Sequence, residues 1–389
     1  MLAGLLKLDR PSNSPLRWHG TVATAFALLF LIIGLWSFVG NYLTPTGIDF
    51  ISFWSAGRLV LQGNPALAYD IHAHRLMEQS IIPKVGLIPF PYPPPFLALV
   101  TPFALTSFEI GFVLWVTVTV SFYAFAASRV APLNYAFGNA PTCIGWMIGQ
   151  SNFLTCGIFM MGVSLISTAP FAAGAVLGLM LFKPQLALLL PVAMLAGREW
   201  RVIAGAIASA TIVLLIGLIL FGGAAYEAFW KILPHYVEFV RDARLPWYEL
   251  ASPFEVARSA NIPQLPALII HVLIATTATA LTARAWWLKL DERIPILAAS
   301  TMLISPYFFT YDCLLIVIPI GWLVKQERRP ILMAFVLACS LIPVLTSFTP
   351  WAFPNTMPLA VIACLYGLHF ETALRRSKNQ EAIAVGLAG

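Results

Sequence analysis

The stretch that decides the fold is residues 21–39, which read TVATAFALLFLIIGLWSFV and hold no charged side chain. Its length is close to the roughly 20 apolar residues that an α-helix needs to cross a bilayer. The run is too long for the apolar part of a typical signal peptide, and no Ala-x-Ala cleavage site closes it. We therefore expect an uncleaved first membrane-spanning helix, preceded by the basic residues Lys7, Arg10 and Arg17.

The rest of the chain repeats this apolar pattern. Of the 389 residues, 59% are hydrophobic and only 10% are charged, whereas a soluble domain carries about 25% charged residues. The sequence therefore predicts an all-α, polytopic transmembrane helical bundle. About 12 apolar segments are expected as spans: 21–43, 91–106, 108–130, 133–148, 150–167, 170–196, 200–221, 264–287, 292–305, 311–325, 330–349 and 355–373.

The basic side chains predict the topology. Although the net charge is +6, they cluster at the ends of apolar segments rather than in one patch, which excludes nucleic acid as an expected partner. Short loops near 198–201 and 284–293 carry the bias and fall on the side of the N-terminus. The positive-inside rule then places both termini in the cytoplasm, and two long loops, 44–90 and 222–263, outside.

The two outer loops are not low-complexity. Both are rich in Trp, Tyr, Phe and Pro, residues typical of the membrane interface. Within the first loop, the stretches 53–61 and 67–82 resemble short amphipathic helices that lie on the outer surface. We interpret residues 1–375 as one integral membrane domain and residues 376–389 as a cytoplasmic tail.

Asp49 stands at the head of the first outer loop, and almost everything around it is apolar. A carboxylate at a membrane surface costs free energy unless it is paired or performs chemistry. Partial burial beside Phe50 and Phe53 would raise its pKa toward a value suited to a general base. The alternative is that Asp49 caps the helix that begins near Phe53.

Six short motifs follow one another in order along the chain: DFISFWSAGR at 49–58, GNPALAY at 63–69, YPPPF at 92–96, GQSN at 149–152, KP at 183–184 and SPYFFTYD at 305–312. This ordered set, across roughly residues 45–330, resembles glycosyltransferase family 87, the polyprenyl-phosphate-mannose-dependent mannosyltransferases of bacteria.

The resemblance implies a GT-C type fold in the bacterial inner membrane, with the active site on the extracytoplasmic face. It implies transfer of a hexose, with mannose the expected sugar, from a polyprenyl-phosphate donor to a lipid or glycan acceptor with inversion. The lipid-linked donor is a substrate, so no cofactor is expected. The resemblance also implies that Asp49 is the catalytic base.

Two cations are candidates for binding the donor phosphate. Arg58 follows Asp49 by nine residues, and it either clamps the phosphate or anchors its helix at the interface. Lys183 is the one cation in the middle of an apolar segment, next to the helix-breaking Pro184. It either contacts the phosphate, snorkels to the interface or pairs with a buried partner.

The remaining candidates each have two interpretations. Tyr92 either lines the sugar site or belongs to a proline run that stiffens the loop. Gln150 and Asn152 are candidate substrate contacts, but they lie between segments expected to meet near the cytoplasmic side, which favours hydrogen bonds between helices. Asp312 either assists Asp49 as a second catalytic acid, binds the acceptor, orients a partner of the donor phosphate or caps a helix. Tyr311 beside it is a candidate substrate contact.

Other function classes leave signals that this sequence lacks. No nucleotide-binding glycine fingerprint, Walker loop, His/Cys cluster or Asp-x-Asp motif occurs, so no metal site is expected. A polytopic transporter or flippase of a lipid-linked saccharide remains the alternative, with inverted repeats and several paired intramembrane charges as its signature. A non-catalytic scaffold is the third class. His72 and His74 are expected to be solvated on a surface helix.

Overall fold

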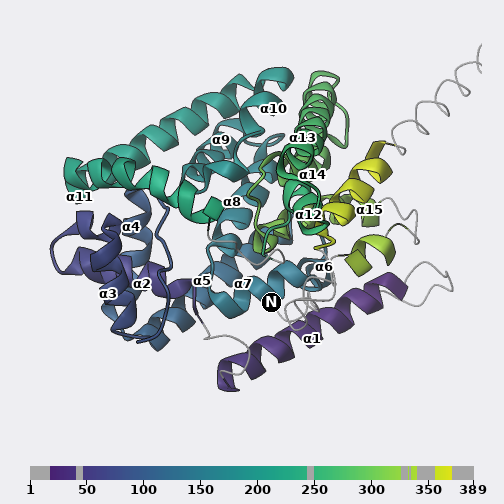
Figure 1. Cartoon of the computed structure of the whole chain (residues 1–389). Coiled ribbons are helices and arrows are strands. Elements are labelled where there is room, and N and C mark those ends of the chain that lie inside the picture. Colours follow the sequence, from purple (N-terminus) through teal and green to yellow (C-terminus); the bar gives the residue numbers. More distant parts are fainter. Residues whose placement is uncertain are drawn as a thin grey trace, which may run out of the picture.

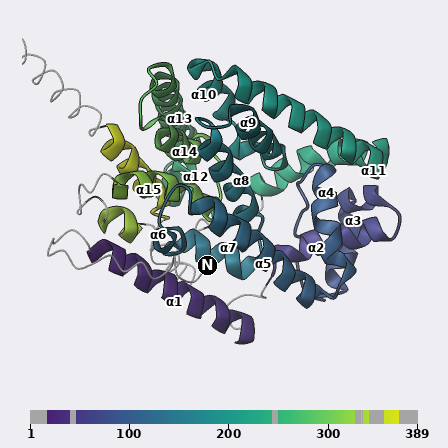
Figure 2. The same cartoon turned by 180° about the vertical axis from the view of Figure 1, so that it is seen from behind.

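Helices make up almost all of the regular structure in the part of the chain that the structure describes. This computed structural model describes residues 18–40, 47–242, 249–325, 332, 334–339 and 355–369. Within those ranges the one strand-like pairing is an isolated bridge between Leu250 and Phe309. The first apolar run forms α1 (Trp18–Gly40), along the edge of the molecule away from α10 (Leu190–Gly197) (Figures 1 and 2).

The other helices follow in chain order, and most are short. They are α2 (Phe50–Leu61), η2 (Pro65–Tyr69), α3 (Ile71–Gln79), α4 (Pro95–Val100), η3 (Thr101–Leu105), α5 (Phe108–Ala127), α6 (Leu133–Phe137), α7 (Ala140–Ile148), α8 (Asn152–Leu165), α9 (Pro170–Gly178), η4 (Leu179–Phe182), η5 (Pro184–Leu186), α11 (Trp200–Asp242), α12 (Pro253–Ser259), α13 (Gln264–Trp287), α14 (Arg293–Ile304), η6 (Thr310–Ile316), α15 (Val317–Lys325) and a last apolar helix Met357–His369.

Four of the described helices are long and apolar enough to cross a membrane, so the expected count of about 12 spans is not confirmed. The four lie at Trp18–Leu35, Phe108–Ala127, Trp200–Tyr236 and Gln264–Trp287. Several other apolar segments are broken into pieces. The segment 170–196 consists of α9, two 3-10 turns and α10. Short apolar helices of this kind are tolerated in a membrane when they are buried against other helices or line a cavity.

Helix α11 is bent sharply at Gly222, whose φ of 73° lies in the left-handed region that favours glycine. The hydroxyl of Tyr226 donates a hydrogen bond to the carbonyl of Leu214 (2.6 Å), so the chain folds back on itself there. Figure 1 shows the two resulting rods meeting at one end of the molecule. The second long loop of the sequence therefore begins as a helix that continues to Asp242.

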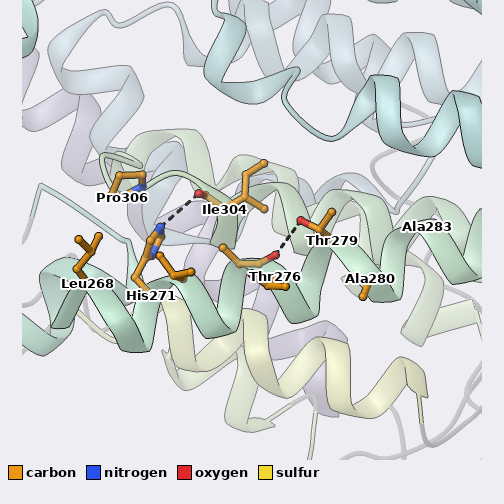
Figure 3. Close-up of a pocket in the computed structure, with 10 residues that line it drawn as sticks. Leu268, His271, Thr276, Thr279, Ala280, Ala283, Ile304 and Pro306 are labelled. Carbon is orange, nitrogen blue, oxygen red and sulfur yellow. Dashed lines mark hydrogen bonds between the residues drawn. The ribbon is translucent and has the colours of Figure 1, made fainter. Parts of the chain in front are cut away.

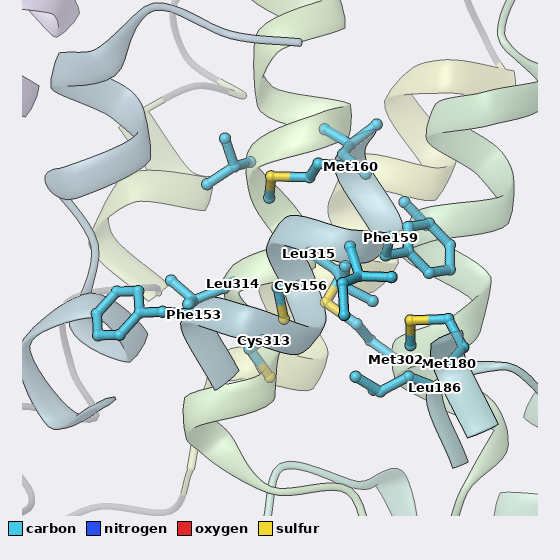
Figure 4. Close-up of a cluster of buried hydrophobic side chains, with 14 of the residues drawn as sticks. Phe153, Cys156, Phe159, Met160, Met180, Leu186, Met302, Cys313, Leu314 and Leu315 are labelled. Atoms are coloured by element: carbon cyan, nitrogen blue, oxygen red, sulfur yellow. The ribbon is translucent and has the colours of Figure 1, made fainter. Parts of the chain in front are cut away.

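The core lies around α8, which packs against α5, α9 and η6. Its side chains are bulky, apolar and soft, and they fill the space between α8 and the irregular turns η4, η5 and η6 (Figure 4). This packing fixes α8 and η6, two elements that carry residues of the polar cluster described below. The labelled members are Phe153, Cys156, Phe159, Met160, Met180, Leu186, Met302, Cys313, Leu314 and Leu315, all of them buried.

A groove of about 650 Å³ runs along α13 (Figure 3). Alanine and aliphatic side chains make up most of its lining, which includes Ile304 and Pro306 at the end of α14. The His271 ring nitrogen Nε2 donates to the carbonyl of Ile304 (3.3 Å), while Nδ1 has no partner among the described residues. The groove is thus apolar apart from this imidazole and two threonines, Thr276 and Thr279.

Candidate active site

Asp49 and Gln150 meet at the centre of the site. The backbone N–H of Asp49 donates to the carbonyl of Ile148 (3.0 Å), and Gln150 Nε2 donates to Asp49 Oδ2 (2.8 Å). The expectation that Gly149–Asn152 lies across the membrane from Asp49 is wrong. Helix α7 has nine residues and is therefore only about 14 Å long, half of the roughly 30 Å hydrocarbon layer.

The orientation of the Gln150 amide follows from its partners. Its Oε1 accepts from the backbone N–H of Ser151 (2.7 Å) and from the hydroxyl of Tyr92 (2.8 Å). A backbone N–H can only donate, so this atom is the oxygen and the amide NH₂ faces Asp49. The Tyr92 hydroxyl also lies 2.7 Å from Ser151 Oγ. Tyr92 therefore belongs to the hydrogen-bond network of the site, besides its place in the proline run.

The Asp49 side chain does not cap a helix. Asp49 occupies the N-cap position of α2, yet its side chain makes no capping hydrogen bond. Burial raises the pKa of this carboxyl group to about 6, against the opposing effects of the Gln150 hydrogen bond and the Lys183 charge. Such a carboxylate is ionised at neutral pH and is still basic enough to accept a proton from a hydroxyl group in a transition state.

Lys183 pairs with a buried partner, which was one of the alternatives that the sequence left open. Its Nζ donates to Asp312 Oδ1 (2.6 Å), and the two side chains are 4% and 1% exposed. Lys183 lies at the break between η4 and η5, and its ammonium group sits 4.8 Å from the centre of the Tyr311 ring. The Asp312 side chain does not cap η6, and its Oδ2 has no partner among the described residues.

Side chains from α8 hold the backbone that carries Tyr311 and Asp312. Asn152 Nδ2 donates to the carbonyl of Tyr311 (3.0 Å), and Cys156 Sγ donates to the carbonyl of Asp312 (3.6 Å). Asn152 thus makes the hydrogen bond between helical segments that its sequence position favoured. The Tyr311 ring stacks on Phe309 with ring centres 5.0 Å apart. These contacts fix the direction of the Asp312 side chain toward Lys183.

A third carboxylate, Glu249, approaches the site from the segment after α11. Its carbonyl accepts from the N–H of Thr310 (2.8 Å), and the neighbouring Leu250 carbonyl accepts from the buried amide of Asn355 (3.0 Å). The same amide donates to Thr310 Oγ1 (2.7 Å), so both segments are clamped together. Burial, and next the charge of Asp49, raise the pKa of Glu249 to about 7.

Glu249 and Ser151 are site residues that were not among the sequence candidates. Glu249 carries the same signal as Asp49, an acid among aromatic residues, in this case after Trp247 and Tyr248. Ser151 has no signal of its own beyond its place within the Gly149–Asn152 motif.

Arg58 is not part of this cluster. Its Nη1 donates to the carbonyl of Ala104 (3.3 Å), and its guanidinium lies 5.4 Å from the centre of the Trp54 ring. These contacts fit the interpretation of Arg58 as an anchor for α2 better than that of a phosphate clamp. Lys183 is therefore the cation that the described part of the chain brings to Asp49.

His74 is buried rather than solvated, because α3 packs against α2. Its side chain is 3% exposed, and its Nε2 lies 3.4 Å from Glu78 Oε1 and 3.3 Å from Ser52 Oγ. His72 is exposed, as expected. The histidine contacts tie α2, and with it Asp49 at its start, to the helix that follows.

Among the described residues, no group of three or more His, Cys, Asp or Glu side chains is arranged to hold a metal ion. The polar cluster consists instead of three carboxylates, one ammonium group, two amides and several hydroxyl groups. Its members are Asp49, Tyr92, Gln150, Ser151, Asn152, Lys183, Glu249, Tyr311 and Asp312. This composition suits a polyhydroxylated substrate with one anionic group.

Comparison with known proteins identifies the family. The model of glycosyltransferase family 87 matches residues 90–306, more than half of the chain. The match includes Tyr92, Gln150 and Lys183, while Asp49 precedes it and Asp312 follows it. No curated protein and no solved structure matches the chain. Together with the apolar helices, the family match shows that the chain belongs to glycosyltransferase family 87 and is a membrane glycosyltransferase.

Proposed function

We propose that the protein transfers a hexose, with mannose the expected sugar, from a polyprenyl-phosphate donor to a hydroxyl group of a lipid or glycan acceptor. Asp49 is the general base in this proposal. The observation that carries it is a partly buried carboxylate that caps no helix, is oriented by Gln150 and lies within electrostatic reach of the Lys183 ammonium. This combination offers a base and a phosphate-binding cation in one cluster.

The chemistry requires few protein groups. The acceptor oxygen attacks the anomeric carbon from the face opposite the phosphate, and its proton passes to the Asp49 carboxylate. The bond from the anomeric carbon to the phosphate oxygen breaks, and its electron pair stays on the phosphate. Transfer thus inverts the anomeric configuration. Because phosphate is a competent leaving group, the enzyme mainly has to place the reactants and accept the proton.

Lys183 serves as the cation for the donor phosphate in this proposal. An ammonium group carries three N–H donors, of which Asp312 Oδ1 uses one. Asp312 therefore acts as a positioning residue for Lys183 rather than as a second base. Breaking a buried ion pair leaves an uncompensated charge, so the phosphate has to join the pair rather than replace Asp312.

The proposed location is the extracytoplasmic face of a bacterial inner membrane, with both termini in the cytoplasm. Asp49 and Glu249 belong to the two long loops that the distribution of Lys and Arg predicts to be outside. Both acids approach the same cluster, which is consistent with a single face for the two loops. A donor with its isoprenoid chain in the bilayer reaches a site at that level without leaving the membrane.

A transporter or flippase is supported less well. Such proteins need several paired charges within the membrane along a substrate path. In the described part of the chain, the buried ion pairs are Lys183–Asp312 and the short-range contact of His74 with Glu78. Membership of a glycosyltransferase family also favours transfer over transport.

Purified protein in nanodiscs tests the proposal with a synthetic polyprenyl-phosphate mannose donor and octyl α-mannoside as acceptor. We expect a new glycoside whose anomeric configuration, read by NMR, is opposite to that of the donor. The wild-type protein is compared with the Asp49→Asn variant, which should bind donor and transfer sugar very slowly. Activity with a nucleotide sugar and none with lipid-linked hexoses would refute the proposed donor class.

A further inference from the structure

The polar cluster contains two electrostatically different pairs of groups. Lys183 and Asp312 form a neutral pair in contact with the Tyr311 ring. Asp49 and Glu249 are two acids within electrostatic reach of each other, and the backbone hydrogen bond between Glu249 and Thr310 holds Glu249 beside the segment that carries Tyr311. The donor phosphate requires the cation of the first pair. The two acids are therefore left for the second substrate.

Glu249 is partly buried, and its carboxyl group lies within electrostatic reach of Asp49. Its backbone is held firmly by Thr310 and by the Asn355 clamp on Leu250. A hydrogen bond from a ligand stabilises such a carboxylate, because burial removes part of its hydration. A rigid backbone that presents such a group is the arrangement expected of a pre-organised binding residue.

We propose that Glu249 binds the acceptor, accepting a hydrogen bond from a hydroxyl group next to the one that attacks, and that this end of the acceptor is an uncharged polyol such as a glycosyl residue. The inference rests on the proposed function, because it takes Asp49 as the base for the attacking hydroxyl. Two neighbouring acids repel a phosphate or carboxylate on the acceptor, whereas vicinal hydroxyl groups donate to both. The acceptor class is thus a neutral sugar terminus rather than a phosphorylated one.

The test compares the Glu249→Gln variant with the wild-type protein, using the same lipid-linked mannose donor and octyl α-mannoside. Loss of a hydrogen bond to a charged group should raise the KM for the acceptor about 10- to 100-fold. The KM for the donor should stay within about twofold, because the donor phosphate is assigned to Lys183 and not to Glu249. Glu255→Gln is the matched control, since Glu255 is another partly buried acid at the start of α12.

Monodeoxy acceptors identify the hydroxyl group involved. One monodeoxy octyl mannoside should lose affinity with the wild-type protein but lose nothing further with Glu249→Gln. This experiment also covers the case of a misfolded variant, because the deoxy series needs only the wild-type protein. If no single deoxygenation beside the attacking hydroxyl raises the KM at least about tenfold, the inference is wrong.

A pH profile separates binding from a purely structural role. The ionisable groups of the site are Asp49, Tyr92, Lys183, Glu249, Tyr311 and Asp312. Replacing the Glu249 carboxylate removes a negative neighbour of Asp49, so the acidic limb of kcat should move to lower pH. An unchanged limb and an unchanged acceptor KM would overturn the inference. Failure of the proposed function looks different, because the wild-type protein would then transfer no sugar at all.

Discussion

Replacement of Asp49 by Asn should separate catalysis from stability. Asn has nearly the same shape, and its side-chain oxygen still accepts the hydrogen bond from Gln150 Nε2. It cannot accept a proton from the acceptor. Loss of a general base typically costs about 10²–10⁴ in rate, equivalent to about 3–5 kcal/mol in the activation barrier. We therefore expect a folded, donor-binding and nearly inactive variant.

The same variant should be more stable than the wild-type protein at alkaline pH. The pKa of Asp49 is raised from 3.8 to about 6, mainly by burial. Below the unfolded value the group is neutral in both states, and folded stability is lost as the pH rises through about 6. Two pKa units correspond to about 3 kcal/mol, which solvent screening of this partly exposed group reduces to about 1–2 kcal/mol. The Asp49→Asn variant does not lose this stability, because the Asn side chain does not ionise.

Thermal unfolding between pH 4 and 8, followed by tryptophan fluorescence in nanodiscs, measures the difference, and transfer assays use the same samples. The two melting curves should coincide near pH 4 and separate toward pH 8. Asp70→Asn is the control: Asp70 caps α3 by accepting from the N–H of Ala73 (2.8 Å), and Asn caps equally well. Near wild-type transfer by a well-folded Asp49→Asn protein would eliminate Asp49 as the base. A pH-independent difference in melting would contradict the assigned burial of its carboxylate.

Four further substitutions, one of them added to another, probe the residues that support the site. Gln150→Leu removes the donor that favours ionised Asp49, so the acidic limb of the pH–rate profile should move to higher pH; an unmoved limb would exclude this role. Lys183→Met should lower the unfolding free energy by about 3–5 kcal/mol by stranding the Asp312 charge. Adding Asp312→Asn to Lys183→Met should restore the melting temperature but not sugar transfer. Recovered transfer in the double variant would show that Lys183 does not bind the donor phosphate. Gly149→Ala should destabilise by about 1–2 kcal/mol in denaturant unfolding, because its φ is 71°; unchanged stability would contradict the strain.

The sequence was sufficient to predict those features that depend on local composition. Apolar segments predicted a helical membrane protein, and isolation among apolar neighbours singled out Asp49 and Lys183. Helix capping was the alternative interpretation for Asp49 and Asp312. Neither side chain caps a helix, because each has an electrostatic partner elsewhere in the fold. A charged residue among apolar neighbours can be recognised from the local sequence alone, without knowledge of the fold.

The partners of these residues could not be predicted, because they come from distant parts of the chain. Asp49 and Gln150 are separated by 101 residues, and Lys183 and Asp312 by 129. No periodic pattern encodes such a contact. The number of spans was also not predicted correctly, since an apolar run of sufficient length need not form one unbroken helix. Pro184 was recognised as a helix breaker from the sequence, whereas the bend at Gly222 was not.

The clamp at Asn355 bears on how the enzyme is made. Ribosomes deliver the chain from the N-terminus, so a nascent protein contains Asp49 and Gln150 long before it contains Asp312, and Asn355 later still. Until Asn355 has emerged, the Leu250–Phe309 bridge joins the two segments without the additional side-chain clamp. A partly synthesised chain therefore contains Asp49 and Gln150 before this clamp can form. The polar cluster with all its clamping contacts is complete only near the end of synthesis.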